Sequence, residues 1–236
     1  MKSIELGARL ASASAFVRQG AVFADIGTDH GYLPLFLIEQ GRIDRSVCSD
    51  INCGPLNTAM DNARLCGLDD RVQTVLTDGL EGLSGLGLTD IAICGMGGEL
   101  ISAIIDRAPW VRDPSVRLIL QPMSRQDKLR RYLAESGFEI LEESYSTETS
   151  KNYLCLLACY SGKPRQMSLA ESVVGVTPED PSMLNSYCRY LRDKLLGAVK
   201  ARDGRPTDER AVFAELAEAI EERIAAVQKR INETII

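Results

Sequence analysis

Val22-Phe23-Ala24-Asp25-Ile26-Gly27-Thr28-Asp29-His30-Gly31-Tyr32 is the stretch of sequence that decides the fold. A short apolar run ends in the acid Asp25, and two glycines follow with three residues between them. Residues 32–38 are typical of the start of a helix. A strand, a glycine-containing turn and a helix form the first unit of a nucleotide-binding α/β sheet. Gly27 and Gly31 permit a sharp turn and the close approach of a ligand.

The spacing of these glycines limits the kind of ligand. It is not G-x-G-x-x-G, so the pyrophosphate of a dinucleotide is not the expected guest. An acid ahead of the glycines suits a ligand that carries a positive charge, such as S-adenosylmethionine (SAM). The alternative is an ordinary strand–helix turn that binds nothing, because short glycine motifs also occur by chance.

The composition is that of an ordinary globular protein. The chain has 236 residues, of which 45% are hydrophobic and 25% charged. This length allows one sizeable domain and an appendage. No run of about 18 apolar residues predicts a membrane span, and no signal-peptide core follows Met1, so we expect a cytoplasmic protein without a membrane partner. A net charge of −6 means that nucleic-acid contacts must come from local basic patches.

The cysteines and the histidine argue against a metal site. Seven cysteines are scattered without a C-x-x-C motif, and His30 is the only histidine. We therefore expect no zinc and interpret the cysteines as reduced thiols of the core. A hydrolytic triad would have to use His30, and no nucleophile elbow lies near it.

Strands and helices alternate regularly through residues 1–162, which we predict to form one domain. A parallel, doubly wound sheet follows from this alternation, with ligands at the carboxyl ends of its strands. Two last strands, 138–142 and 153–160, form a hairpin-like pair. The other predicted strands are 22–25, 45–51, 71–76, 90–94 and 116–120, and the predicted helices are 3–18, 32–40, 56–66, 99–107 and 128–136.

Polar residues and glycines follow the ends of the predicted strands. They are Asp25, Asp50, Asp78, the segment 95–98 and Gln121-Pro122. Asp50 lies where an acid commonly binds ribose hydroxyls, although a plain surface acid is the alternative. Asp78 is placed to accept a hydrogen bond from an adenine amino group, or it forms an Asp-Gly turn with Gly79.

Residues 163–236 have a different character. A turn-rich linker at 173–180 precedes a helix at 183–201, and Asp203-Gly204-Arg205-Pro206 interrupts the chain. A heptad-like stripe from 213 to 231 then predicts an antiparallel, coiled-coil-like hairpin of two helices. This hairpin is either a packing or dimerisation element, or an arm that grips a partner. Basic residues interleaved with Tyr187 and Tyr190 suit phosphate contact and base stacking.

A second basic cluster, at 124–131, follows the fifth predicted strand. It lies beside the expected ligand edge of the sheet. The alternative for this cluster is a solvated helix face.

Several motifs together resemble the bacterial tRNA (adenine-22-N1)-methyltransferase family. They are D-I-G-T-D-H-G-Y-L-P at 25–34, D-I with G-P-L at 50–56, D-G-L at 78–80, G-M-G-G at 95–98 and L-I-L-Q-P-M at 118–123. The resemblance covers most of the chain, including the C-terminal helices. It implies a Rossmann-like class I methyltransferase fold with a mostly parallel seven-stranded sheet. It also implies SAM-dependent methylation of N1 of adenine 22 in tRNA, with 163–236 as the tRNA-binding arm.

The resemblance also implies a set of binding residues. The residues expected at SAM are Asp25, Gly27, Thr28, Gly31, Asp50, Ile51, Asp78, Gly79, Gly95, Met96 and Gly97. The two basic clusters, and not the resemblance, supply the residues expected at tRNA, which are Arg125, Lys128, Arg130, Arg131, Arg189, Arg192 and Lys194. The segment 95–98 stands where amino-methylating relatives carry N-P-P-Y, so it offers no aromatic ring to the base. Tyr32 and Tyr145 are candidates for that stacking role.

The expected catalytic residues are Asp29, His30 and Tyr32. Neutral adenine N1 already has its lone pair, and its attack on a methyl group places positive charge on the ring. A carboxylate near N1 or N6 stabilises that charge, and Asp29 is our choice for it. The alternative is that Asp29 caps the following helix. His30 orients Asp29, contacts the ligand or is structural.

Three other classes of function compete with this hypothesis. A SAM-dependent methyltransferase acting on a small molecule or protein agrees with the acidic net charge. A non-catalytic Rossmann-like binding module would use the helical hairpin as a dimer interface. An NAD-dependent oxidoreductase is disfavoured by the missing G-x-G-x-x-G motif. The sequence leaves the oligomeric state open.

Overall fold

A seven-stranded sheet forms the centre of the molecule. The computed structural model describes residues 4–206 and 210–234. The strand order is β3-β2-β1-β4-β5-β7-β6, and β7 alone runs antiparallel to its neighbours. This confirms the predicted mostly parallel, Rossmann-like sheet. The strands are β1 (Phe23–Ile26), β2 (Ser46–Asp50), β3 (Val72–Leu76), β4 (Asp90–Gly97), β5 (Arg117–Ser124), β6 (Phe138–Glu148) and β7 (Lys151–Tyr160).

Helices cover both faces of this sheet. The first three helices cover one face of the sheet, where Phe16, Leu33 and Ala63 pack with sheet residues such as Phe23 and Ile119. The fourth and fifth helices pack on the opposite face of the sheet, which carries the alternate residues of each strand because side chains alternate across a strand. The helices are α1 (Ala8–Phe16), α2 (Tyr32–Glu39), α3 (Cys53–Cys66), α4 (Gly98–Asp106), α5 (Gln126–Glu135), α6 (Leu169–Val174), α7 (Leu184–Asp203) and α8 (Arg210–Thr234).

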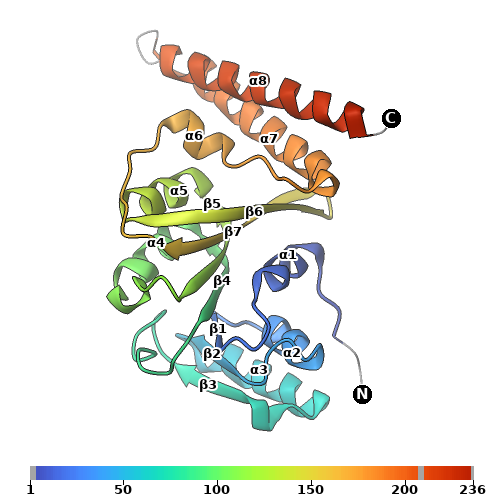
Figure 1. Cartoon of the computed structure of the whole chain (residues 1–236), viewed down its shortest axis with the longest axis vertical. Coiled ribbons are helices and arrows are strands. Elements are labelled where there is room, and N and C mark those ends of the chain that lie inside the picture. Colours follow the sequence, from blue (N-terminus) through green and yellow to red (C-terminus); the bar gives the residue numbers. More distant parts are fainter. Residues whose placement is uncertain (1–3, 207–209, 235–236) are drawn as a thin grey trace.

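The last two helices form the predicted hairpin. Figure 1 shows α7 on the β6–β7 side of the molecule and α8 outside α7, at the opposite end from β3. Tyr187 and Leu191 of α7 and Ile220 and Val227 of α8 are buried in the same apolar cluster as Leu156 of the sheet. The hairpin therefore shares its core with the sheet, while most charged residues of α8 remain exposed.

Several element boundaries differ from the predicted ones. The predicted strand 138–142 extends to Glu148, because Thr149 and Ser150 form a tight turn with φ of 47° and 65°, the geometry that matches strand twist. Helix α3 begins at Cys53, so Pro55 is its third residue and not its first. The prediction of a turn-rich linker at 173–180 is partly wrong, since α6 occupies 169–174 and a 3₁₀ turn covers Pro181–Met183. Within the described residues, no helix combines the length and hydrophobicity that a membrane crossing requires.

Candidate functional site

The first turn connects β1 to α2 and lies against two neighbouring strands. The backbone N–H groups of Gly27 and Thr28 donate to the carbonyl of Ser49, at 2.8 and 3.0 Å. Gly27 has φ of 71°, and a Cβ on it would lie 2.0 Å from Cε of Met96. Glycine is favoured here by the positive φ, and a Cβ would also force the end of the Met96 side chain to move.

Asp25 is a buried carboxyl group at the start of this turn. It lies between Cys48 and Ala92 in the sheet register and is 8% exposed. Burial raises its pKa from 3.8 to about 6, although the hydrogen bond from Thr28 Oγ1 and the charge of Arg9 each lower it in part. A buried carboxyl group that is costly to ionise is stabilised in its charged form by a cation brought beside it.

Two further acids follow the next strands, as predicted. Asp50 is half-buried at the end of β2 and accepts a hydrogen bond from the N–H of Asn52 at 2.8 Å. The next residue, Ile51, leaves 64% of its surface exposed. Asp78 is half-exposed, beside Gly79, and pairs with Nη2 of Arg107 at 2.9 Å. The three acids Asp25, Asp50 and Asp78 therefore lie along one edge of the sheet, next to exposed apolar surface.

The segment 95–98 is not the loop that the sequence predicts. β4 continues to Gly97 with a shift of register on each side of Met96, and Met96 pairs with Pro122. Gly98 is already the first residue of α4. A Cβ on Gly98 would lie 2.4 Å from the carbonyl oxygen of Arg125. The glycines thus let the end of β4 pack closely against the first turn on one side and against the start of α5 on the other.

Arg9 is a residue of this site that the sequence analysis missed. Its Nη1 donates to Oε1 of the buried Gln121 at 2.9 Å, and the same oxygen accepts the N–H of Gly95 at 3.2 Å. Oε2 of Glu148 accepts the backbone N–H of Arg9 at 3.1 Å, which anchors the start of α1 to the β6–β7 hairpin. Gln121 lies 112 residues away in the sequence. The helical periodicity of α1 therefore gives no sign that Arg9 differs from an ordinary surface residue.

The guanidinium of Arg9 has spare hydrogen-bonding capacity. It carries five N–H donors, and its bond to Gln121 is the single side-chain bond that it forms within residues 4–206 and 210–234. The residue is only half-buried. A half-buried cation with most donors unused, next to Gln121 and electrostatically coupled to Asp25, is suited to bind an anionic group.

Asp29, His30 and Tyr32 lie together on the outer side of the first turn. His30 Nε2 is 3.2 Å from Oδ2 of Asp29, whose side chain is 80% exposed. The rings of His30 and Tyr32 stack with centroids 5.2 Å apart. Gly31 is the residue before α2, and no side chain caps that helix. The capping alternative for Asp29 is therefore wrong, and its carboxylate is available to a ligand.

The predicted basic residues divide into exposed and engaged groups. Arg131, Arg189 and Arg192 are exposed, and Arg125 and Lys128 form exposed contacts with Glu99. Lys194 is half-buried and donates to Oε1 of Gln126 at 2.8 Å, so α7 lies against the start of α5. Since α5 follows β5 directly, Arg125 at its start lies at the carboxyl end of the strands, where the ligand is expected.

Four expected contacts are wrong because their side chains are buried. Arg130 has no exposed surface and pairs with Glu143, so it does not contact an external phosphate. Tyr145 is 3% exposed, Tyr187 is fully buried and Tyr190 is 3% exposed, so none of these rings offers a face to a base. Of the two stacking candidates, Tyr32 remains, with 45% of its surface exposed.

The seven cysteines are all free, and Cys48, Cys155 and Cys188 are buried. Burial, followed by the negative charge of Asp25, raises the pKa of Cys48 to about 12, so this thiol stays protonated. In the described part of the chain, no three histidine, cysteine or acidic side chains gather in a group able to hold a metal ion.

A family model described as "Methyltransferase domain" matches residues 6–156. The tRNA (adenine(22)-N(1))-methyltransferase of Bacillus subtilis is 31% identical over 158 residues, which are 67% of this chain and 66% of that protein. The chain therefore aligns with slightly less than two thirds of this relative. A candidate tRNA methyltransferase of Mycoplasma pneumoniae is 30% identical over 72% of this chain and 79% of its own length.

A solved structure extends the similarity to nearly the whole chain. Streptococcus pneumoniae Sp1610, described as a candidate tRNA (m1A22) methyltransferase, was solved in complex with S-adenosyl-L-methionine. It is 31% identical, with a TM-score of 0.79, and the match covers 93% of this chain and all of that chain. The similarity therefore includes the helical hairpin as well as the sheet.

The raised pKa of Asp25 predicts a pH-dependent effect of Asp25→Asn on stability. The folded protein holds a proton at Asp25 up to about pH 6, whereas the unfolded chain releases it near 3.8. Wild-type stability therefore falls as pH rises through this window. Asparagine does not ionise, so the stability of the variant relative to the wild type should rise between pH 4 and pH 7, by about 2 kcal/mol in the free energy of unfolding. Urea unfolding at both pH values measures this; parallel pH dependences would refute it.

Proposed function

This chain belongs to the bacterial tRNA (adenine-22-N1)-methyltransferase family of methyltransferase-domain proteins, and from that premise we propose that it transfers a methyl group from SAM to N1 of adenine 22 in tRNA. The observation that carries the proposal is the whole-chain similarity to a relative solved with SAM. The strand-end residues described above supply the chemical groups that such a reaction needs.

The residues at the strand ends fit the parts of SAM. The methionyl end of SAM carries an ammonium and a carboxylate group. Asp25 would hold the ammonium, which also stabilises the charged form of this buried acid. The unused donors of Arg9 would bind the carboxylate. Asp50 would accept hydrogen bonds from the ribose hydroxyls, and Ile51 and Asp78 would receive the adenine ring and its amino group.

SAM supplies an electrophilic methyl group on a sulfonium. The task of this chain is then to position the acceptor base and to stabilise the positive charge that its ring gains. Asp29 is exposed on the first turn, and His30 lies within 3.2 Å of its carboxylate. We assign Asp29 to stabilise the charged adenine and to accept a proton from N6, with His30 orienting that carboxylate. Tyr32 offers a ring face for stacking.

Exposed cations on two elements supply the proposed RNA surface. Arg125 and Arg131 lie at α5, and Arg189 and Arg192 lie on α7. Phosphate contacts position RNA without specifying its sequence. N1 of adenine is normally engaged in base pairing, so the target must be unpaired or flipped out. Contacts to phosphate supply the free energy for this, and the binding should weaken steeply with salt.

The proposed function is tested by methyl transfer from labelled SAM to two tRNA transcripts. One carries adenine at position 22 and the other carries guanine there. We expect incorporation into the first transcript alone, mapped as 1-methyladenine at position 22. Incorporation into both would move the target to another nucleotide. Binding of SAM without transfer to either transcript would favour a small molecule or a protein as acceptor.

Replacement of the proposed catalytic carboxylate should separate turnover from binding. Asp29→Asn keeps the size of the side chain but removes the charge, so kcat should fall about 100-fold. The Kd of SAM, measured by calorimetry, should stay within about two-fold of the wild type. Asp69→Asn is the matched control, because Asp69 is an exposed acid ahead of β3, at the opposite edge of the sheet. Normal turnover in Asp29→Asn would remove Asp29 from the mechanism.

The role of Arg9 predicts a ligand-specific loss of affinity. Arg9→Gln should raise the Kd of SAM at least about ten-fold, the loss expected for a hydrogen bond between charged groups. The Kd of 5′-methylthioadenosine, which lacks the carboxylate, should not change. Arg45→Gln, at an exposed arginine just before β2, is the control. Equal losses for both ligands would assign Arg9 a structural role, and a selective loss of tRNA affinity would assign it to RNA phosphate.

A further inference from the structure

An ion pair without exposed surface joins the sheet to the helical hairpin. Arg130 on α5 and Glu143 on β6 meet in a two-pronged contact, with Nε to Oε1 at 2.6 Å and Nη2 to Oε2 at 2.9 Å. Both side chains are 0% exposed. This geometry fixes the two groups in direction as well as in distance.

The same pair holds the segment that leads to the hairpin. Nη1 of Arg130 donates to the carbonyls of Ser172 and Val173 at 2.8 and 3.3 Å, and Oε2 of Glu143 accepts the N–H of Val176 at 2.9 Å. Gly175 has φ of 69°, and a Cβ there would lie 2.3 Å from Nη2 of Arg130 and 2.4 Å from Oε2 of Glu143. Only glycine lets this segment close over the ion pair.

Helix α7 is attached to this network by two tyrosines. The hydroxyl of Tyr190 accepts a bond from Nη1 of Arg130 at 3.0 Å and donates to the carbonyl of Val173 at 3.2 Å. Tyr187 donates to the carbonyl of Val174, also at 3.2 Å. Tyr145 of β6 donates to Glu143. We call Arg130, Glu143, Tyr145, Gly175 and Tyr190 the latch.

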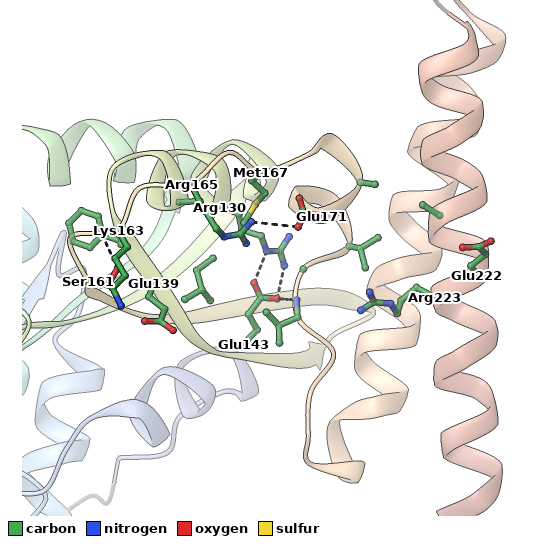
Figure 2. Close-up of a pocket in the computed structure, with 18 of the residues that line it drawn as sticks. Arg130, Glu139, Glu143, Ser161, Lys163, Arg165, Met167, Glu171, Glu222 and Arg223 are labelled. Carbon is green, nitrogen blue, oxygen red and sulfur yellow. Dashed lines mark hydrogen bonds and ion pairs between the residues drawn. The ribbon is translucent and has the colours of Figure 1, made fainter.

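A cavity lies beside the latch, between the sheet and the helical hairpin. Figure 2 shows Arg130 and Glu143 next to a cavity that lies between β6 on one side and α8 on the other. Its volume is about 800 Å³, and Glu222 and Arg223 of α8 are among its lining residues. The α8 side is tied to the linker by Arg223, whose Nη1 donates to Oγ1 of Thr177 at 2.7 Å. Helix α7 also contacts the β6–β7 hairpin directly, where Nδ2 of Asn152 donates to Oδ2 of Asp193 at 2.6 Å. That contact is exposed, so the latch is the buried polar part of the connection.

The latch lies beneath part of the proposed RNA surface. Tyr190 of the latch is the neighbour of Arg189 and lies two residues before Arg192, both of which point to solvent on α7. Helix α7 has 20 residues and is therefore about 30 Å long. Tyr190 lies 13 residues before the end of α7 at Asp203, a distance of about 20 Å. A rotation of about 10° at the latch would therefore move that end by about 3.4 Å, the rise between stacked nucleotides.

We propose that the latch holds the α7–α8 hairpin at one orientation to the first turn and thereby selects which nucleotide of a bound tRNA reaches the methyl-transfer site. The inference rests on the proposed function. Phosphate contacts along a strand repeat at every nucleotide and do not define a register by themselves. A rigid connection between the phosphate-binding helix and the catalytic turn supplies that register. Arg130 and Glu143 are then positioning residues, which act through the hairpin and not on the base.

The test replaces the latch by an apolar pair. Removal of one partner leaves a buried charge, whereas replacement of both by hydrophobic residues of similar size commonly preserves a fold. Arg130→Met/Glu143→Leu is therefore the main variant, and Glu142→Gln, at an exposed neighbour on β6, is its control. The substrates are transcripts with adenine at position 22 and at both flanking positions. Readouts are the Kd of SAM, kcat/KM for tRNA and the position of each methyl group.

We expect the double variant to bind SAM within about two-fold of the wild type. Its kcat/KM for tRNA should fall about ten-fold, and methylation should spread from position 22 to the flanking adenines. A general loss of structure would lower SAM affinity and would not change the position of the methyl group. If the double variant does not fold, Tyr190→Phe removes one hydroxyl from the latch and should show the same spread to a smaller extent.

The outcomes separate the latch from the proposed function. Unchanged kcat/KM and methylation confined to position 22 in the folded variant, or in Tyr190→Phe where the double variant does not fold, would overturn the role of the latch alone. Absence of transfer by the wild type to every transcript would overturn the proposed function, and the inference with it. A spread of methylation in Glu142→Gln as well would assign register to surface charge and not to the latch.

Discussion

The contact between the end of β4 and the first turn determines the shape of the candidate site. Met96 packs where a side chain on Gly27 would stand, and Gly98 packs against the backbone of Arg125. β1, β4 and β5 are adjacent in the sheet, so their carboxyl ends are already neighbours. Because Gly27 and Gly98 have no side chains, the first turn, the end of β4 and the start of α5 come into direct contact. The two glycine motifs of the sequence are therefore one structural feature, although some 70 residues separate them.

The acidic and basic residues around the candidate site lie in different places. Asp25 is buried beneath the turn, Asp50 and Asp78 line the sheet edge, and the exposed arginines lie at the start of α5 and on α7. Exposed charges more than about 8 Å apart are largely screened at physiological salt. The acids of α8, and the overall charge of −6, are therefore compatible with the proposed RNA surface. Net charge is a weak guide to partners when the charges are segregated in this way.

The sequence predicted the sheet well because alternating strands and helices leave few topologies, and the parallel strand ends bring Asp25, Asp50 and Asp78 to one edge. It failed where a polar side chain occupies a core position. Arg130 follows Leu129 and precedes Leu133 on the buried stripe of α5, and Tyr187 lies on the corresponding stripe of α7. Helical periodicity alone indicates burial at these positions. Arg9 differs, because its role depends on contacts across the fold that no local pattern contains.

The Arg130–Glu143 ion pair lies where the segment 172–176 meets the sheet, and its placement there has a physical reason beyond stability. A buried ion pair is often no more stabilising than hydrophobic residues of the same volume. The segment 172–176, however, presents two carbonyls and one N–H to the interior, and buried backbone groups need partners. A guanidinium and a carboxylate satisfy all three while bonding to each other. Hydrocarbon side chains can fill this space but cannot define the direction of the segment. The pair therefore fixes how the chain enters α7, and with it the angle at which the hairpin leaves the sheet.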